Sequence, residues 1–228
     1  MQQQNKTIGA RLLGAVPFVT KGGRVADIGT DHAYLPIYLA QEGLISGALA
    51  CDINRGPIQS ARQNIGAAGF SGKIETLLTD GLHGVEEYHP DDVIIFGMGG
   101  ELIVKILEEA PWVKEESIGL ILQPMTRASV LRAYLTQNGF DITGESITFE
   151  DKYYQIIAAR YCGKNSDLDE RELLIGKKNI EARSPLFAGF VRHEIQVLEK
   201  IREGKRRSVS GESTEESRMI EQLEELLK

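Results

Sequence analysis

The chain has 228 residues, a hydrophobic content of 42% and a formal net charge of −7. This length accommodates one α/β domain with a smaller additional part, and the composition is typical of a globular protein rather than a disordered one. We find no run of about eighteen apolar residues and no signal peptide, so the sequence predicts a cytoplasmic protein without a membrane-spanning helix.

Short apolar segments alternate with helical patterns along the first 160 residues, which predicts a parallel sheet with helices on both faces. The helical patterns cover 33–43, 56–69, 101–110 and 127–139, and Gly43, Gly69 and Gly139 are placed as C-terminal stops. Only Asp151 and Lys152 separate the last two strands, and so short a link predicts an antiparallel hairpin. The predicted strands are 25–29, 47–53, 73–78, 92–98, 118–124, 141–150 and 153–161.

After Tyr161 the pattern changes to polar turns followed by helical segments. Between residues 176 and 207 there are nine Lys or Arg and four Glu, a local charge of +5 in an acidic chain. Composition leaves two interpretations open, a solvated helical hairpin or a surface that binds phosphates.

The cysteines and histidines do not predict a metal site. Cys51 and Cys162 lie in apolar strand-like segments without a second cysteine at CxxC spacing, and the four histidines show no ligand spacing. We expect buried thiols and no bound metal.

The turn after the first strand, in RVADIGTDHAYLP, predicts a binding site for a cationic ligand. Asp27 and Gly29 end the strand, and ligands of doubly wound folds bind at this edge of the sheet. The GxGxxG motif of dinucleotide-binding folds is absent, because Asp31 stands where its second glycine would be. A carboxylate there is unfavourable beside a pyrophosphate, which argues against a dinucleotide-dependent dehydrogenase, and is favourable beside a sulfonium and an ammonium group.

Acidic residues also end the next two strands. Asp52 is placed to accept hydrogen bonds from the hydroxyls of a ribose, and Asp80, next to Gly81, from an adenine amino group. Adenine, ribose and a cationic amino-acid tail together describe S-adenosylmethionine. Each acidic residue alone is more often a helix cap or a turn residue, so the prediction depends on their recurrence at successive strand ends.

Five segments together, RVADIGTDHAYLP, CDINRGPIQSARQNI, TDGL, FGMGGELIVKIL and LILQPM, resemble a known family. They are similar to the bacterial tRNA adenine-N1 methyltransferases that modify adenine 22 of the D-arm, a class I S-adenosylmethionine-dependent family. The resemblance implies an α/β, Rossmann-like fold, with a seven-stranded, mostly parallel sheet whose last strand is antiparallel. It also implies a methyltransferase domain over 1–163 and a helical, coiled-coil-like C-terminal domain over 164–228.

The resemblance implies roles by position. The methionine portion of the cofactor lies at Asp27, Gly29 and Asp31, the ribose at Asp52 and the adenine at Asp80 and Gly81. The predicted cofactor-binding residues are Asp27, Gly29, Asp31, His32, Asp52, Ile53, Asp80, Gly81 and Gly97, and the predicted catalytic residues are Asp31, Gly97, Met98, Gly99, Gly100 and Gln123.

The GMGG sequence at 97–100 replaces the Asn/Asp-Pro-Pro-aromatic motif of enzymes that methylate exocyclic amines. Adenine N1 has an in-plane lone pair, so orientation supplies much of the acceleration. We expect Asp31 and the 97–100 turn to lie closest to the reaction, with Gln123 and Met125 holding the base. The alternative is a tight turn without ligand contact.

Three functional hypotheses remain: a tRNA methyltransferase, a methyltransferase acting on a small molecule, and a non-catalytic nucleotide-binding module whose appendage binds a partner. The net charge favours the second, and the intact acidic series argues against the third. We expect tRNA to be the partner and the chain to be a monomer. The predicted RNA-binding residues are Lys177, Lys178, Arg183, Arg192, Lys205, Arg206 and Arg207.

Overall fold

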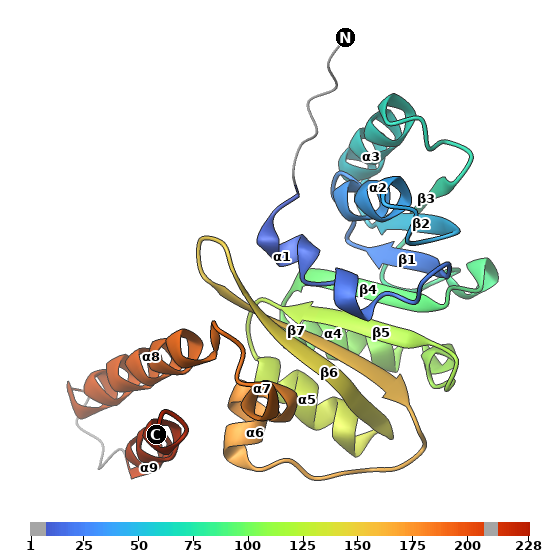
Figure 1. The fold of residues 1–228 in the computed structure, drawn as a ribbon. Coiled ribbons are helices and arrows are strands. Elements are labelled where there is room, and N and C mark those ends of the chain that lie inside the picture. Colours follow the sequence, from blue (N-terminus) through green and yellow to red (C-terminus); the bar gives the residue numbers. More distant parts are fainter. Residues whose placement is uncertain (1–7, 208–213) are drawn as a thin grey trace.

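The computed structural model describes residues 8–207 and 214–228, which contain one seven-stranded sheet in the order β3-β2-β1-β4-β5-β7-β6 (Figure 1). The first five strands are parallel to one another, and β7 is antiparallel to both β5 and β6. The predicted fold class is therefore confirmed. The strands are β1 (Arg24–Ile28), β2 (Gly47–Asp52), β3 (Ile74–Leu78), β4 (Asp92–Met98), β5 (Gly119–Pro124), β6 (Phe140–Phe149) and β7 (Tyr153–Tyr161).

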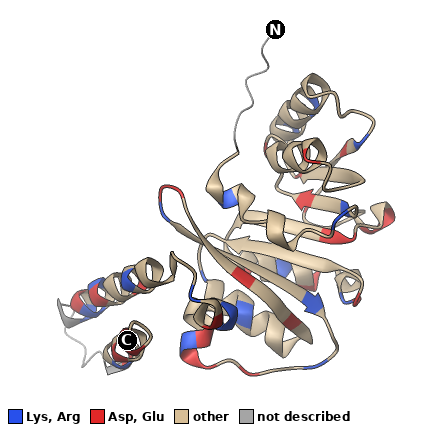
Figure 2. Cartoon of the chain, viewed as in Figure 1, with Lys and Arg blue, Asp and Glu red and all other residues tan. Residues whose placement is uncertain are grey.

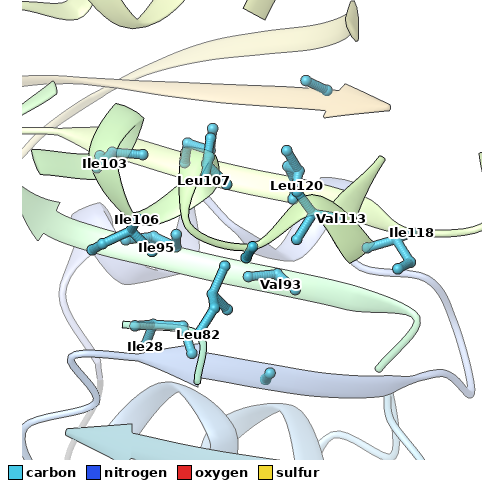
Figure 3. Packing of buried hydrophobic residues seen from close by; sticks show 14 of the residues in the cluster. Ile28, Leu82, Val93, Ile95, Ile103, Ile106, Leu107, Val113, Ile118 and Leu120 are labelled. Atoms are coloured by element: carbon cyan, nitrogen blue, oxygen red, sulfur yellow. The ribbon is translucent and has the colours of Figure 1, made fainter. Parts of the chain in front are cut away.

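Helices cover both faces of this sheet, because strand side chains alternate between two apolar clusters. In β4, Val93 and Ile95 join one cluster, and Ile94 joins the other. Figure 3 shows the first cluster, in which Ile103 and Leu107 pack over the sheet. Its helices are α4 (Gly100–Glu108) and α5 (Ala128–Gln137), and those of the second face are α1 (Ala10–Leu13), α2 (Tyr34–Gln41) and α3 (Arg55–Ala67).

The short helices η1 (Val16–Phe18), η2 (Glu86–Tyr88) and η3 (Pro111–Val113) connect these elements. The three glycines predicted as helix stops have the positive φ angles that such positions require, between 67° and 82°. The hairpin is also confirmed, with one difference: β6 ends at Phe149, so the loop contains Glu150 as well as Asp151 and Lys152.

The C-terminal part is helical, as predicted. Residues 170–182 form two short helices rather than one, because Gly176 between them adopts a φ of 96°. The helices are α6 (Glu170–Ile175), α7 (Lys177–Ala182), α8 (Phe187–Arg207) and α9 (Thr214–Glu225). Apolar residues of α6, α8 and α9 pack with Ile147 of β6 in a third cluster.

A buried ion pair joins this helical part to the sheet. The Nε of Arg132 in α5 donates to Oε1 of Glu145 in β6 at 2.7 Å, and both side chains are fully buried. Arg132 also donates to Leu173 O at 2.9 Å, and Glu145 Oε2 accepts from Lys178 N at 2.9 Å. The pair therefore connects α5, α6, α7 and the sheet.

Candidate functional site

The predicted site residues gather at the carboxyl edge of the sheet, because β1 to β5 are parallel and end at the same side. The turn after β1 is hydrogen-bonded to β2, since the amides of Gly29 and Thr30 both donate to Cys51 O, at 2.9 and 2.8 Å. The turn after β2 is joined to the segment after β3 by Thr79 N donating to Asp52 O at 3.0 Å. The strand ends therefore form one continuous surface.

The turn after β1 is built from left-handed residues. Gly29, Asp31 and Ala33 have φ angles of 74°, 51° and 57°. These conformations turn the chain sharply from the strand into α2, and only glycine adopts them without strain. Asp31 is exposed, with its carboxylate 3.5 Å from Nε2 of His32. The turn thus presents a carboxylate and an imidazole to the edge of the sheet.

Asp27 lies beneath this turn and is only 6% exposed. Burial raises the pKa of its carboxyl to about 6, and the negative charge of Asp52 adds to this rise. The hydroxyl of Thr30 donates to Asp27 Oδ2 at 2.6 Å. This hydrogen bond and the positive charge of Arg11 both lower the pKa of Asp27 and so reduce the rise. A cation placed beside Asp27 would stabilise its carboxylate form.

The turns after β2 and β3 combine acidic and apolar side chains. Asp52 is half-buried, and its Oδ1 accepts a hydrogen bond from Asn54 N at 2.8 Å. Ile53 and Leu78 beside it are 59% and 44% exposed, unusually high for large apolar side chains. Asp80 is exposed, and Gly81 has a φ of 56°. This part of the edge offers apolar surface and carboxylate acceptors together.

The GMGG turn after β4 is held by the loop that follows β5. Met125 N donates to Met98 O at 2.7 Å, and Gly100 N donates to Thr126 O at 2.8 Å. A Cβ at Gly100 would collide with the carbonyl oxygen of Arg127, so this position requires glycine. The turn is therefore close-packed on one side.

Gln123 is placed differently from the prediction. Its side chain is fully buried, and Oε1 accepts from Gly97 N at 3.2 Å while Nε2 donates to Pro124 O at 2.9 Å. A buried amide with these partners cannot also face a base at the surface. Gln123 supports the turn from below, and the prediction that it holds the base is corrected in this respect.

Arg11 is a site residue that the sequence did not indicate. Its Nη1 donates to Gln123 Oε1 at 3.2 Å, although the two residues are 112 positions apart. The backbone of Arg11 is held by Glu150 of the hairpin loop, whose Oε2 accepts from Arg11 N at 3.1 Å. The N-terminal helix thus brings a guanidinium between the β1 and β4 turns, and no local motif signals such a long-range contact.

The predicted RNA-binding residues lie in several environments. Lys177 and Arg192 are exposed. Figure 2 shows Lys and Arg (blue) mixed with Asp and Glu (red) along α8. Arg183 donates to Leu226 O at 2.9 Å, and Lys178 lies 3.2 Å from Glu181. Lys205 is paired with Glu216. The side chains of Arg206 and Arg207 lie outside the described part of the structure.

The described residues contain neither a metal-binding cluster nor a membrane-spanning helix. Residues 8–207 and 214–228 contain no group of three or more His, Cys, Asp or Glu side chains that could hold a metal ion. Within the same ranges, no helix has the length and apolar content needed to cross a bilayer.

Comparison with known proteins identifies relatives of the whole chain. A family model described as a methyltransferase domain matches residues 8–157. The tRNA (adenine(22)-N(1))-methyltransferase of Bacillus subtilis is 32% identical over 201 residues, which cover 85% of this chain and 83% of that protein.

Solved structures of high similarity include two complexes. A putative tRNA (m1A22) methyltransferase of Streptococcus pneumoniae, bound to S-adenosyl-L-methionine, is 35% identical with a TM-score of 0.84, over 97% of this chain and 100% of the other. M. capricolum TrmK, bound to S-adenosyl-homocysteine, is 30% identical with a TM-score of 0.79, over 96% and 97% of the two chains. The resemblance inferred from the sequence motifs is confirmed, and the chain belongs to the tRNA (adenine(22)-N(1))-methyltransferase family.

Proposed function

We propose that this protein transfers the methyl group of S-adenosylmethionine to N1 of adenine 22 in tRNA. The observation that carries the proposal is the continuous edge formed by Asp27, Asp52 and Asp80 beside a glycine turn at 97–100, in a chain of this family. The similarity to tRNA (adenine(22)-N(1))-methyltransferases supports tRNA as the substrate and adenine 22 as the modified base. The geometry of the sheet edge supports binding of S-adenosylmethionine.

The residues at the edge fit this cofactor. Asp27 is a buried carboxyl whose carboxylate form a cationic neighbour would stabilise, and S-adenosylmethionine has a sulfonium and an ammonium group. Asp52 provides acceptors for the ribose, and the exposed side chains of Ile53 and Leu78 provide apolar contact for adenine. Arg11 supplies a positive charge for the cofactor carboxylate. When bound, the cofactor supplies an electrophilic methyl group.

The turn at 97–100 orients the acceptor base. A ring nitrogen with an in-plane lone pair needs position more than activation, so a turn of small residues that admits a flat base is sufficient. Gln123 keeps this turn in place by accepting from Gly97 N. Arg11 acts through the same oxygen of Gln123 and is a positioning residue in this respect.

Asp31 is our candidate for the group nearest the reacting base. Its carboxylate is exposed at the edge, where it would stabilise the positive charge that methylation leaves on the adenine. We expect Asp31→Asn to slow methyl transfer even at saturating cofactor, where weaker binding of the cofactor no longer limits the rate. Asp141→Asn, an exposed acid at the start of β6, is the matched control.

We assign the helical part over 164–228 to tRNA binding, with Lys177 and Arg192 as the exposed cations that contact phosphates. Phosphate contacts give an affinity that decreases with salt. Because tRNA is the substrate, we place the protein in the cytoplasm, and we expect it to act as a monomer.

The test is methyl transfer from labelled S-adenosylmethionine to unmodified tRNA transcripts, followed by nucleoside analysis. We expect N1-methyladenosine, and its loss when adenine 22 is replaced by guanine. Cofactor binding without transfer to any tRNA would refute the proposal. The net charge of −7 would then direct the search to small-molecule acceptors.

A further inference from the structure

A hollow lies beside the loop that holds the 97–100 turn, where the helical part meets the sheet. We name it the junction hollow; its volume is about 330 Å³, within the range of small-ligand sites. Residues 124–129 and 152–155 form the walls on the side of the sheet. Leu174, Phe190, His193 and Glu194 of α6 and α8 form the opposite wall.

The junction hollow and the 97–100 turn share one loop. Residues 124–129 line the hollow, and Met125 and Thr126 of the same loop hydrogen-bond to Met98 and Gly100. A ligand in the hollow is therefore separated from the reacting base by the thickness of this loop. A substrate longer than one nucleotide can occupy both positions at once.

The helical part is held firmly at the hollow. The rings of Phe190 and His193 in α8 lie 5.8 and 5.7 Å from the ring of Tyr153 in β7. A Cβ at Gly189 would collide with the Tyr153 hydroxyl, so the helix approaches the strand as closely as a glycine allows. Figure 1 shows the start of α8 beside the β6–β7 hairpin. The hollow is thus a built feature of the fold.

The polar lining of the hollow favours an anion, in contrast with the acidic chain as a whole. Arg127 and Lys152 are exposed cations on the side of the sheet, and His193 is exposed on α8. Arg127 has an acidic neighbour, Glu101, at 3.9 Å, a distance at which an exposed pair is weak. Glu194 is the acidic group in the lining, and burial raises the pKa of its carboxyl.

The acids of the adjacent hairpin loop are occupied by contacts of their own. Asp151 Oδ1 accepts from the hydroxyl of Tyr154 at 2.6 Å, and Glu150 Oε2 accepts from Arg11 N. Lys152 lies against the Tyr154 ring, with Nζ 5.4 Å from the ring centre. The lysine therefore contacts an aromatic surface at the rim.

We propose that the junction hollow binds one nucleotide of the tRNA that flanks the target adenine. Its phosphate lies between Arg127 and Lys152, and its sugar or base edge faces His193 and Glu194. A protonated Glu194 donates a hydrogen bond to an acceptor of the nucleotide, and an ionised one accepts from a hydroxyl or amino group. This inference rests on the proposed function, because it takes tRNA as the substrate.

The first test measures binding of an unmodified tRNA transcript in the presence of S-adenosylhomocysteine. For Arg127→Gln/Lys152→Gln we expect the tRNA dissociation constant to increase about tenfold and the slope of log affinity against log salt to decrease by about 1 to 2. The control is Lys21→Gln/Lys114→Gln, which removes two exposed lysines near the opposite edge of the sheet. An unchanged cofactor dissociation constant shows that the variants are folded.

The second test locates the contact on the RNA. A tRNA is assembled with a neutral methylphosphonate at the linkage on the 5′ or the 3′ side of adenine 22. At one of the two linkages, the methylphosphonate should weaken tRNA binding by the unaltered protein. The same methylphosphonate should not change tRNA binding by the Arg127→Gln/Lys152→Gln variant, because the variant already lacks the contact that the methylphosphonate removes. Additive losses at both linkages would overturn the inference, as would a variant that matches the lysine control.

These outcomes are distinct from failure of the proposed function. If the unaltered protein neither binds nor methylates tRNA, the proposed function fails and this inference fails with it. If the unaltered protein methylates adenine 22 and the variant binds tRNA as the control does, only the junction hollow loses its role.

Discussion

The protonation state of Asp27 is expected to control the affinity for the cofactor. The carboxyl is buried, and its pKa of about 6 lies well above the usual 3.8. A cofactor with a sulfonium and an ammonium group binds better to the carboxylate than to the neutral acid. Binding near pH 5 must therefore include the loss of a proton from Asp27.

The size of the effect follows from this pKa. In the free protein, Asp27 is mostly protonated at pH 5 and mostly ionised at pH 7, about ten to one in each case. The dissociation constant for S-adenosylmethionine should accordingly be about tenfold larger at pH 5 than at pH 7.

The same shift affects stability without cofactor. The folded protein holds this proton more tightly than the unfolded chain does. The contribution of Asp27 to the free energy of unfolding is therefore fully present below pH 4 and is lost as the pH rises through 6. The total change is about 3 kcal/mol. Denaturant unfolding of the free protein at pH 4.5, 5.5 and 7 measures it, with Asp27→Asn as the reference.

The assay is isothermal titration of S-adenosylmethionine between pH 5 and pH 7. Asp27→Asn is the matched control, because it keeps the shape and removes the titration. We expect weaker binding by the Asn variant at pH 7 and an almost flat profile below it. Effects of pH that do not involve Asp27 are common to both proteins, so only the difference between the two profiles reports on Asp27. A wild-type constant that is equal at pH 5 and pH 7, or an Asn variant with the same tenfold ratio, would refute the reasoning.

Three further outcomes are expected. Gln123→Ala removes the acceptor of Gly97 N, so the rate constant of tRNA methylation should decrease at least tenfold in single-turnover kinetics. Cofactor affinity should change little, and equal losses in rate and affinity would indicate general damage. Gly29→Ala forces a Cβ into a φ of 74° and to 2.6 Å from Met98 Cε, which should cost about 1 to 2 kcal/mol in thermal unfolding and weaken cofactor binding. Arg132→Met leaves Glu145 buried without its cation, and we expect a loss of about 3 to 5 kcal/mol in urea unfolding. The exposed pair of Arg171 with Asp169 is the control, since Arg171→Met should change stability little.

Sequence by itself determined the sheet and the place of the site. Apolar segments with acidic and glycine ends identify parallel strands, and parallel strands necessarily bring their carboxyl ends to one edge. Asp27, Asp52 and Asp80 could therefore be assigned to one site without coordinates. The short link after Phe149 likewise required an antiparallel hairpin, because a parallel crossover needs many more residues.

Only the tertiary structure decided which way the side chains face and which distant segments meet. The strand pattern around Gln123 does not show whether its side chain is exposed or buried. The amide is buried because Gly97 and Arg11 supply hydrogen-bond donors from elsewhere in the chain. Lys205 counts as a cation in the sequence and is paired with Glu216 of the next helix. The junction hollow exists because α8 packs against Tyr153, a contact between residues far apart in the chain. Local patterns encode the elements, whereas long-range packing determines burial, pairing and the cavities between them.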